Sequence, residues 1–489
     1  MFVSKNSYSD ELAKSILDTV KSITFEEGIL LSNEVIKLYK DKRIDSYIYV
    51  NGEKKQISSS KILGLDYNEV LSDKEEIKIY DDITDLDNLK YIPKNKTIII
   101  CKHSLRNNDD TDLENYDNYY NIISKLKNNN QNNKIIVNVK NRKAFSKSKL
   151  YNSNYDIIID GIDLTKYKLD ELKKEDKLLD LMVSDINNSN YSPFEKFIAV
   201  YNIVKKFKKY LENNEKHSDA RALNKFLNNN YMVCIGYAKL LNILLDRVNI
   251  NSYYYNVYLD TSYDKGFTLD DIPVTLEGHA RLIVNICDPK YNIDGFYVSD
   301  PTWDNNLEKD FYNHALISFD KTALENRFFY LSYEDLALNC KDINEYNNKI
   351  NMLIDRKKDT LFKNFGSNER RENLALNTII NLIKDILMKL EPNMYKKLKE
   401  KYSELEIFSA DKTSQYNFIN EAGLFFIDKL GRDIPIETVI EAATNVNKEV
   451  FGLDDSNIEK YKSKLLEENK SRDKIMYPYY YTNDEYYSK

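Results

Sequence analysis

The sequence predicts an α+β protein, and two observations carry this prediction. In the first third of the chain, short runs of β-branched residues alternate with helical patterns. From about residue 350 onwards the strand signals fade and apolar residues recur at helical spacing. A single hydrophobic core stops growing near ~250–300 residues. Because the chain has 489 residues, we expect more than one domain.

The N-terminal part is predicted to be an α/β domain covering residues 1–170. Helical patterns lie near residues 9–21 and 113–127. The strand-like runs lie at residues 47–50, 77–80, 97–100, 135–137 and 157–159. Apolar strands separated by helices indicate a partly parallel sheet. Because no glycine-rich phosphate loop follows any of these runs, nothing in the sequence supports a nucleotide site, and the role of this domain stays open.

A helix is predicted to begin at Pro193. Ser192 is a suitable N-cap, and Glu195 lies three residues after it. The helix ends in the basic run 205–209, where cations complement the negative end of the helix dipole. We interpret this run as a helix end and not as a nucleic-acid patch. The composition agrees, since 71 Lys and Arg against 78 Asp and Glu give a net charge of −7.

The segment 231–306 carries the candidate chemistry. Cys234 lies where an extended apolar stretch meets a helix with Ala238 and Leu241 on its apolar face. The positive end of a helix dipole favours the thiolate form of a cysteine at the helix N-terminus. Gly236 leaves room for the backbone of a substrate to approach closely.

His279 begins a predicted strand. By alternation it shares one face with Arg281, while Ala280 and Leu282 lie on the other face. If His279 acts as a base, the face that it shares with Arg281 must look toward Cys234.

The pairing of this strand with the next depends on the turn between them. A turn at residues 289–290 places Asp300 directly opposite His279, which suits a carboxylate that orients an imidazole. A competing turn at residues 294–295 moves the register toward Asp304.

Cys234, His279 and Asp300 supply a nucleophile, a base and an orienting group. The thiolate attacks a carbonyl, the imidazolium protonates the leaving group, and the carboxylate fixes the imidazole tautomer. A lone cysteine before a leucine-rich helix is ordinarily a buried hydrophobe. The assignment therefore depends on the three motifs occurring together.

These motifs resemble the transglutaminase-like superfamily, the papain-related Cys-His-Asp cysteine peptidases and acyl-transferases. The resemblance rests on the V-C-I-G-Y-A run at 233–238, on His279-Ala280 before an apolar strand, and on D-P-T-W-D at 300–304. Bacterial members often carry the C-x-G-Y-A and D-P-T-W-D motifs in this form. The resemblance covers about residues 190–310. It implies a papain-like transglutaminase core, in which the helix bearing the cysteine packs on an antiparallel sheet bearing the histidine and aspartate, within a catalytic domain at 171–345.

The candidate substrate-binding residues are Arg281, Gly236 and Tyr237. The family often has Trp-Asn after His-Ala, where this sequence has Arg281-Leu282. An Arg fork beside the cleft can hold a substrate carboxylate through two parallel hydrogen bonds. The alternative is an internal ion pair of Arg281 with Glu277 or Asp304.

Several roles near the triad stay open. Asp304 is the alternative to Asp300 as the orienting group, and Trp303 is interpreted as a structural plug behind the triad. The backbone N–H of Cys234 is a candidate oxyanion donor. The candidates for a side-chain partner in that role are Asn229, Asn230 and Tyr231.

The other cysteines are interpreted as structural, and no metal or cofactor is predicted. Cys101 and His103 lie two residues apart, but two ligands do not make a metal site. Cys287 and Cys340 have no partner motif. Four widely spaced cysteines suit a reducing compartment.

Residues 346–489 are predicted to form a helical C-terminal region with a Tyr-rich tail at 477–489. An apolar stripe runs through 374–387 and stops at Glu391-Pro392, and a second helical pattern covers 436–451. We find no catalytic motif in this region.

The sequence therefore predicts a cytoplasmic thiol enzyme that acts on a carbonyl of a protein or peptide, most simply a cysteine peptidase. Transglutaminase or deamidase chemistry is the alternative, because all three reactions share an acyl-enzyme. Two hypotheses assign the protein to other functional classes. One is a catalytically silent binding module, and the other is a scaffold whose flanking regions bind a partner. No signal-peptide pattern and no apolar run of roughly 18–20 residues is seen, so no membrane association is expected. The oligomeric state stays open.

Overall fold

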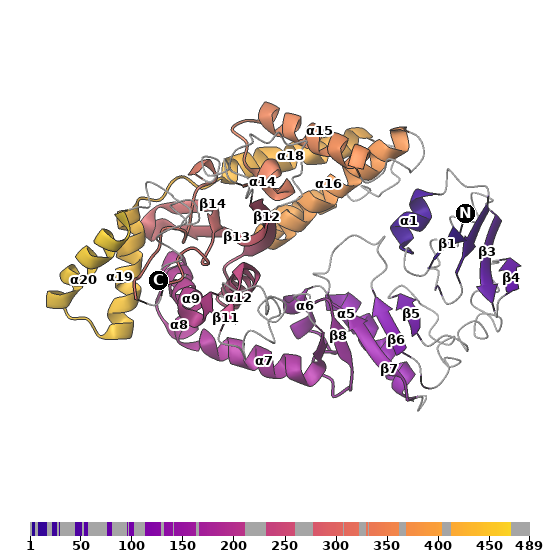
Figure 1. Ribbon diagram of the computed structural model, residues 1–489, viewed down its shortest axis with the longest axis horizontal. Helices are drawn as coiled ribbons and strands as arrows, with labels where there is room; N and C mark the ends of the chain where they lie inside the picture. The colour runs from indigo at the N-terminus through magenta and orange to yellow at the C-terminus, as the bar shows by residue number, and fades with distance from the viewer. Residues whose placement is uncertain are drawn as a thin grey trace. The chain divides into compact units, whose positions relative to one another are not determined.

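The computed structural model describes the following residues: 2–4, 8–16, 22–26, 29, 45–50, 53–56, 76–80, 95, 97–101, 113–128, 132–139, 141–162, 166–210, 231–259, 277–306, 308–321, 329–330, 332–360, 368–402 and 412–470. The chain divides into two units. Unit 1 contains residues 1–174 and 358–375, and unit 2 contains residues 175–357 and 376–489. Figure 1 labels the helices and strands of both.

Unit 1 contains two sheets with short helices beside them. The first sheet has the order β1-β2-β3-β4, formed by β1 (Phe2–Val3), β2 (Ser22–Phe25), β3 (Asp45–Val50) and β4 (Glu53–Gln56). The second has the order β5-β6-β7-β8-β9, formed by β5 (Glu76–Tyr80), β6 (Thr97–Cys101), β7 (Lys134–Asn138), β8 (Ile158–Asp160) and β9 (Tyr167–Lys168). The described helices are α1 (Asp10–Ser15), α5 (Leu113–Asn128) and α6 (Arg142–Ser146).

The predicted N-terminal strands are confirmed. Four of the five β-branched runs lie wholly in a strand and the fifth, 157–159, overlaps β8 by two residues. The second sheet is parallel from β5 to β8 with β9 antiparallel at its edge. A parallel sheet requires connections that cross over its face, and α5 provides one between β6 and β7. The helix predicted near residues 9–21 is described only as Asp10–Ser15, because residues 17–21 lie outside the described ranges.

Unit 2 is built around an antiparallel sheet with the order β14-β13-β12-β15. Its strands are β12 (Ser252–Leu259), β13 (Glu277–Asp288), β14 (Ile293–Ser299) and β15 (Phe329–Tyr330). One side of the sheet is covered by α9 (Pro193–Phe207) and α12 (Cys234–Arg247), and the other side by α14 (Tyr333–Leu338) and α18 (Lys412–Lys429) (Figure 1). The chain is therefore a mixed α+β protein.

The remaining elements are mostly helical. They are α7 (Leu169–Met182), α8 (Ser184–Asn188), α15 (Ile343–Thr360), α16 (Asn368–Leu390), α17 (Pro392–Lys401), α19 (Ile436–Phe451) and α20 (Asp455–Glu468), with a two-stranded parallel pair of β10 (Lys209–Tyr210) and β11 (Tyr231–Met232). Within the described residues, no helix combines the length and the apolar character needed to cross a bilayer.

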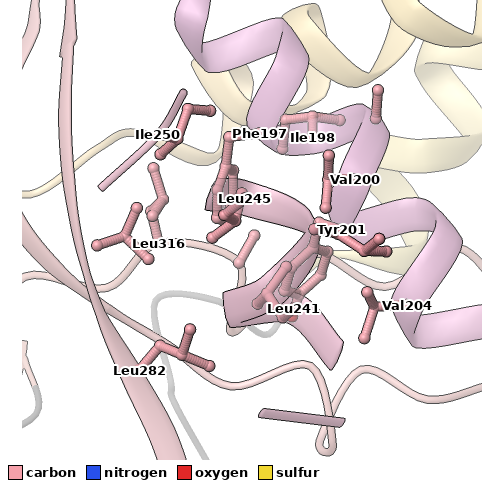
Figure 2. Packing of buried hydrophobic residues seen from close by; sticks show 14 of the residues in the cluster. Phe197, Ile198, Val200, Tyr201, Val204, Leu241, Leu245, Ile250, Leu282 and Leu316 are labelled. Carbon is pink, nitrogen blue, oxygen red and sulfur yellow. The ribbon is translucent and has the colours of Figure 1, made fainter. Parts of the chain in front are cut away.

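The core of unit 2 joins α9, α12 and one face of β13. Figure 2 shows Phe197 and Val204 of α9 beside Leu241 and Leu245 of α12, with Leu282 of β13 nearby. The predicted start of α9 is confirmed, because Pro193 is its first residue and the Glu195 carboxylate accepts a hydrogen bond from the Ser192 N–H at 2.9 Å. This core fixes the helix that begins at Cys234 against the strand that carries His279.

Apart from residues 358–375, which belong to unit 1, the C-terminal helices belong to unit 2. Apolar side chains of α19 belong to the same core as α9 and α12: Ile436, Val439, Ile440, Ala442, Ala443 and Val446. The first boundary falls at 174/175, close to the predicted 170/171, but the predicted separate region at 346–489 does not stand apart. The helices at 368–390 and 436–451 match the two predicted apolar patterns, whereas the Tyr-rich tail lies outside the described residues.

Candidate functional site

Cys234 is the first residue of α12. Val233 before it is extended, and its carbonyl accepts hydrogen bonds from the N–H groups of Gly236 at 2.8 Å and Tyr237 at 3.1 Å. The helix therefore starts directly from the short strand β11, and Cys234 lies at its N-terminal end. The cysteine is 8% exposed and packs in the core of unit 2.

The β13–β14 hairpin differs in register from the predicted one. Leu282 pairs with Ser299 and Asp288 pairs with Ile293, so the turn spans four residues instead of two. Three of these form the 3-10 helix η4 (Pro289–Tyr291), and Asn292 follows in the left-handed region at φ 54°. Asp288 stabilises this longer turn, because its side chain accepts a hydrogen bond from the Lys290 N–H at 3.0 Å.

The longer turn still brings His279 and Asp300 together. Adding two residues to a turn shifts the pairing by one step along the same face, whereas a shift of one residue would move Asp300 to the other face. Asp300 therefore lies diagonally from His279 instead of directly opposite. The His279 Nε2 and the Asp300 Oδ2 are 2.5 Å apart.

Asp300 is oriented by both of its oxygens. Oδ2 contacts His279, and Oδ1 accepts a hydrogen bond from the Thr302 N–H at 3.2 Å. Both His279 and Asp300 are buried. Because Nε2 of the imidazole faces the carboxylate, Nδ1 is the ring nitrogen available to a thiol.

The protonated form of His279 is strongly favoured. Burial alone lowers the pKa of the imidazole, but the charge of Asp300 and its hydrogen bond, together with a hydrogen bond to Cys234, raise the pKa of His279 to about 10. The structure thus brings together the three residues of the predicted triad, in the order thiol, imidazole and carboxylate.

Asp304 does not orient His279. Its Oδ1 lies 3.0 Å from the His314 Nδ1, and its Oδ2 accepts hydrogen bonds from the His314 N–H at 2.9 Å and the Tyr201 hydroxyl at 2.7 Å. The Trp303 ring lies between the two imidazoles, with ring centroids 5.4 Å from His279 and 6.4 Å from His314. The sequence reasoning missed His314 and Tyr201; the one available signal was that the chain has only 4 His.

Arg281 lies in an internal ion pair with Asp335, a partner that was not predicted. It is 1% exposed, and its guanidinium contacts both oxygens of Asp335 at 3.3 Å and donates to the Tyr255 hydroxyl at 2.7 Å. A buried guanidinium needs an opposite charge, and Asp335 in the capping box at the start of α14 supplies it. This arrangement favours the ion pair over the predicted substrate contact.

Tyr237 and Gly236 are also buried, in the first turn of α12. The Tyr237 hydroxyl donates to the Lys208 carbonyl at 2.7 Å, and its ring stacks on Tyr210 with centroids 6.4 Å apart. The Tyr237 side chain is fully buried, so its contacts are those of a core residue, not of a substrate contact. The reason is the helical spacing, which turns Tyr237 toward α9 and β10 while Cys234 lies at the helix end.

The remaining predicted residues are only partly described. Tyr231 lies exposed on β11, whereas Asn229, Asn230 and His103 are outside the described residues. Cys234, Cys287 and Cys340 are free thiols, of which only Cys287 is exposed. In the described part of the chain, no group of three or more His, Cys, Asp or Glu is arranged to hold a metal ion.

The site can act on an electrophilic carbon. A thiol at a helix start, an imidazolium in contact with it and a buried carboxylate behind the imidazole are the parts of nucleophilic thiol catalysis. No protein-family model matches the chain, and no curated protein matches it either. The case for a function therefore rests on these residues.

Proposed function

We propose that the protein is a thiol enzyme that attacks a carbonyl of a protein or peptide through Cys234, His279 and Asp300. The observation that carries the proposal is the buried imidazole of His279, which contacts Asp300 at 2.5 Å and hydrogen-bonds to Cys234. Burying ionisable groups is costly, and a thiol, an imidazole and a carboxylate in this order are the groups that nucleophilic thiol catalysis uses.

The reaction begins with a proton already on the imidazole. The Cys234 thiolate attacks the carbonyl carbon, and a tetrahedral oxyanion forms. The C–N bond then breaks as the imidazolium gives its proton to the leaving nitrogen, which leaves a thioester on Cys234. Water attacks the thioester while the neutral imidazole takes up one of its protons, the C–S bond then breaks, and the acid product leaves with the Cys234 thiolate and the imidazolium restored.

Peptide hydrolysis is the first choice among reactions that share this thioester. The resemblance to papain-related peptidases and acyl-transferases supports the chemistry, and water is the resolving nucleophile that needs no second binding site. If an amine attacks the thioester in place of water, the reaction is transamidation. If the acyl donor is a glutamine side chain and water attacks, the reaction is deamidation. We also propose a cytoplasmic setting, since a nucleophilic thiol persists in a reducing compartment.

A labelling experiment tests the nucleophile. The full chain is treated at neutral pH with limiting iodoacetamide, and the modified cysteines are quantified by mass spectrometry. Cys287 is the internal reference, because it is exposed. Partial desolvation of its thiol and the nearby Asp294 raise the pKa of this cysteine. We expect Cys234 to react at least about 10-fold faster than Cys287, in spite of being buried, because a thiolate paired with an imidazolium is the reactive form.

Two variants serve as controls. His279→Ala should remove the advantage of Cys234 and leave the rate at Cys287 unchanged. Cys234→Ala should abolish cleavage of a denatured-protein substrate and incorporation of a labelled amine, whichever of the two the wild type performs. Labelling of Cys234 no faster than Cys287 in the wild type would favour the silent binding module.

A further inference from the structure

Asp304, in the turn that follows Asp300, forms a second buried pair of a carboxylate and an imidazole with His314. Asp304 is fully buried and accepts three hydrogen bonds: from the His314 Nδ1, from the His314 N–H and from the Tyr201 hydroxyl. His314 and Tyr201 are buried as well, and they come from different elements. Tyr201 lies in the middle of α9, and His314 lies in the segment that runs beside the end of β14.

The same two residues also hold the backbone of Asp300. The Asp300 N–H donates to the His314 carbonyl at 3.0 Å, and the Tyr201 hydroxyl lies 3.3 Å from the Asp300 carbonyl. Val298, two residues before Asp300 in β14, exchanges two backbone hydrogen bonds of 2.8 Å with Ile317. The segment that contains His314 is thus paired with the end of β14. Asp304 is therefore the acceptor for His314, whose carbonyl binds the Asp300 N–H, and for Tyr201, whose single proton lies closer to Asp304 and is shared with the Asp300 carbonyl.

Asp304 keeps its charge in this environment. Burial raises the pKa of the carboxyl group, but His314 and the nearby Lys205 outweigh burial and lower it below its ordinary value. Lys205 is itself buried, and its Nζ donates to the Phe311 carbonyl at 2.7 Å and lies 3.7 Å from Asp310. The groups that face Asp304 are thus one imidazole, one phenol and the amino group of Lys205, whose pKa burial lowers to about 7.

We propose that Asp304 is a positioning residue, which acts on the reaction through Asp300 by holding His314 and Tyr201 in place. The proposal rests on the proposed function, since it gives Asp304 a part in the triad without contact to the substrate. Its physical basis is the short contact between Asp300 and His279. A carboxylate held at 2.5 Å from an imidazole loses much of its effect when its backbone moves by a fraction of an ångström.

The titration of His279 measures this positioning directly. In the full chain labelled with ¹⁵N-histidine, NMR follows the imidazole nitrogens against pH, and the chain has only 4 His to assign. The Asp304 carboxylate accepts three hydrogen bonds. In Asp304→Asn, one of its oxygens becomes an amide NH₂, which cannot accept and faces one of the donors. We expect the pKa of His279 to fall by about one unit in this variant, in the same direction as in Asp300→Asn.

Activity gives a second readout. With a substrate cleaved by the wild type, Asp304→Asn should lower kcat by about 10-fold with KM unchanged, because the substrate contacts are untouched. If Asp304→Asn does not fold, Tyr201→Phe replaces it. That variant removes only the hydroxyl that joins Asp304 to Asp300 and should lower the pKa of His279 by a smaller amount.

Asn305→Ala is the matched control. Asn305 follows Asp304 in the same turn, but its side chain donates to the carbonyls of Lys205 at 2.5 Å and Lys208 at 3.0 Å and does not bind the groups that hold Asp300. This variant loosens the turn and should leave the titration of His279 at its wild-type position.

Two outcomes overturn the proposal. One is an unchanged pKa of His279 in both Asp304→Asn and Tyr201→Phe, and the other is an equal fall in Asn305→Ala, which would indicate general loosening. A wild-type Cys234 that labels no faster than Cys287 would refute the proposed function alone. The titration still decides whether Asp304 positions Asp300.

Discussion

His279 and Arg281 are both buried on β13, two residues apart, yet their surroundings give them different tasks. The imidazole lies between a thiol and a carboxylate, and the proposed function uses its proton. The guanidinium is paired with Asp335 and hydrogen-bonded to Tyr255, and it stays protonated at any ordinary pH. The same strand thus carries one residue suited to chemistry and one suited to holding α14 on the sheet.

The Arg281 ion pair makes a prediction about stability. Arg281→Ala leaves the Asp335 carboxylate buried without its guanidinium partner, so we expect the free energy of unfolding to fall by about 3–5 kcal/mol. Cleavage of acidic and neutral peptides by the folded variant should change by the same factor. The control is Arg281→Met combined with Asp335→Leu, which removes both charges and should recover part of the stability. A loss confined to acidic peptides would instead restore Arg281 as a substrate contact.

At this scale the sequence predicted the triad but not the residues that surround it. Cys234, His279 and Asp300 each lie in a short motif at the start or end of an element, and such positions can be recognised one by one. Asp335 lies in a capping box with Ser332, which predicts a helix start but no contact with Arg281, and His314 lies in no motif. They meet Arg281 and Asp304 only because the chain returns to the sheet, and contacts between distant segments leave no local pattern.

At the scale of elements, local signals predicted helices and strands well but not their register. The N-terminus of α9 was predicted because Ser192, Pro193 and Glu195 act within one turn of the chain. The hairpin turn was predicted two residues too short, because the sequence does not reveal that the Asp288 side chain caps η4 and also accepts the Phe194 N–H at 2.8 Å. A tertiary contact selected the turn.

Glu195 joins three elements at the N-terminus of α9. Its carboxylate accepts hydrogen bonds from the Ser192 N–H at 2.9 Å, the Lys290 Nζ at 2.6 Å, the Tyr291 hydroxyl at 2.7 Å and Asn445 of α19 at 3.1 Å. Burial raises the pKa of this group, but the hydrogen bonds, that of Lys290 first, outweigh burial and lower the pKa from 4.5 to about 2.

Glu195→Gln tests this junction. We expect the variant to be less stable by about 2 kcal/mol at pH 7, because hydrogen bonds to a charged group are replaced by weaker ones. A lowered pKa means that the stabilisation is present above pH 4.5 and is lost as the pH falls through about 2. Urea unfolding of both proteins from pH 7 down to pH 2 should show the difference shrinking over that interval. A difference that stays constant with pH would mean that the charge of Glu195 contributes nothing.

At the scale of the whole molecule, the first domain boundary was predictable and the second was not. The boundary predicted at 170/171 lies close to the division between the units at 174/175, whereas the loss of strand signals after residue 350 marks only a change of secondary structure. Among the helices that follow, α19 packs its apolar side chains into the core that contains α12. Helical periodicity shows that α19 has an apolar face but not what that face packs against.

The packing of α19 predicts that residues 171–345 do not fold alone. Burying a Val or Ile side chain contributes roughly 1.5–3 kcal/mol, so Ile436, Val439, Ile440 and Val446 together contribute on the order of 6–12 kcal/mol. That amount is comparable to the whole stability of a domain, about 5–15 kcal/mol. We expect the fragment 171–345 to show no cooperative thermal transition by circular dichroism. Fast labelling of Cys234 should be lost with it.

Point variants in the full chain provide the matched comparison. Val439→Asp sets a carboxylate into the core and should lower the melting temperature sharply, whereas Val450→Asp lies on the same helix at a side chain that is 66% exposed and should change it little. Both variants carry the same added charge, so the difference between them reports burial alone. A cooperative transition of the fragment 171–345 near that of the full chain, or equal melting temperatures for the two variants, would show that the core around Cys234 is complete without α19.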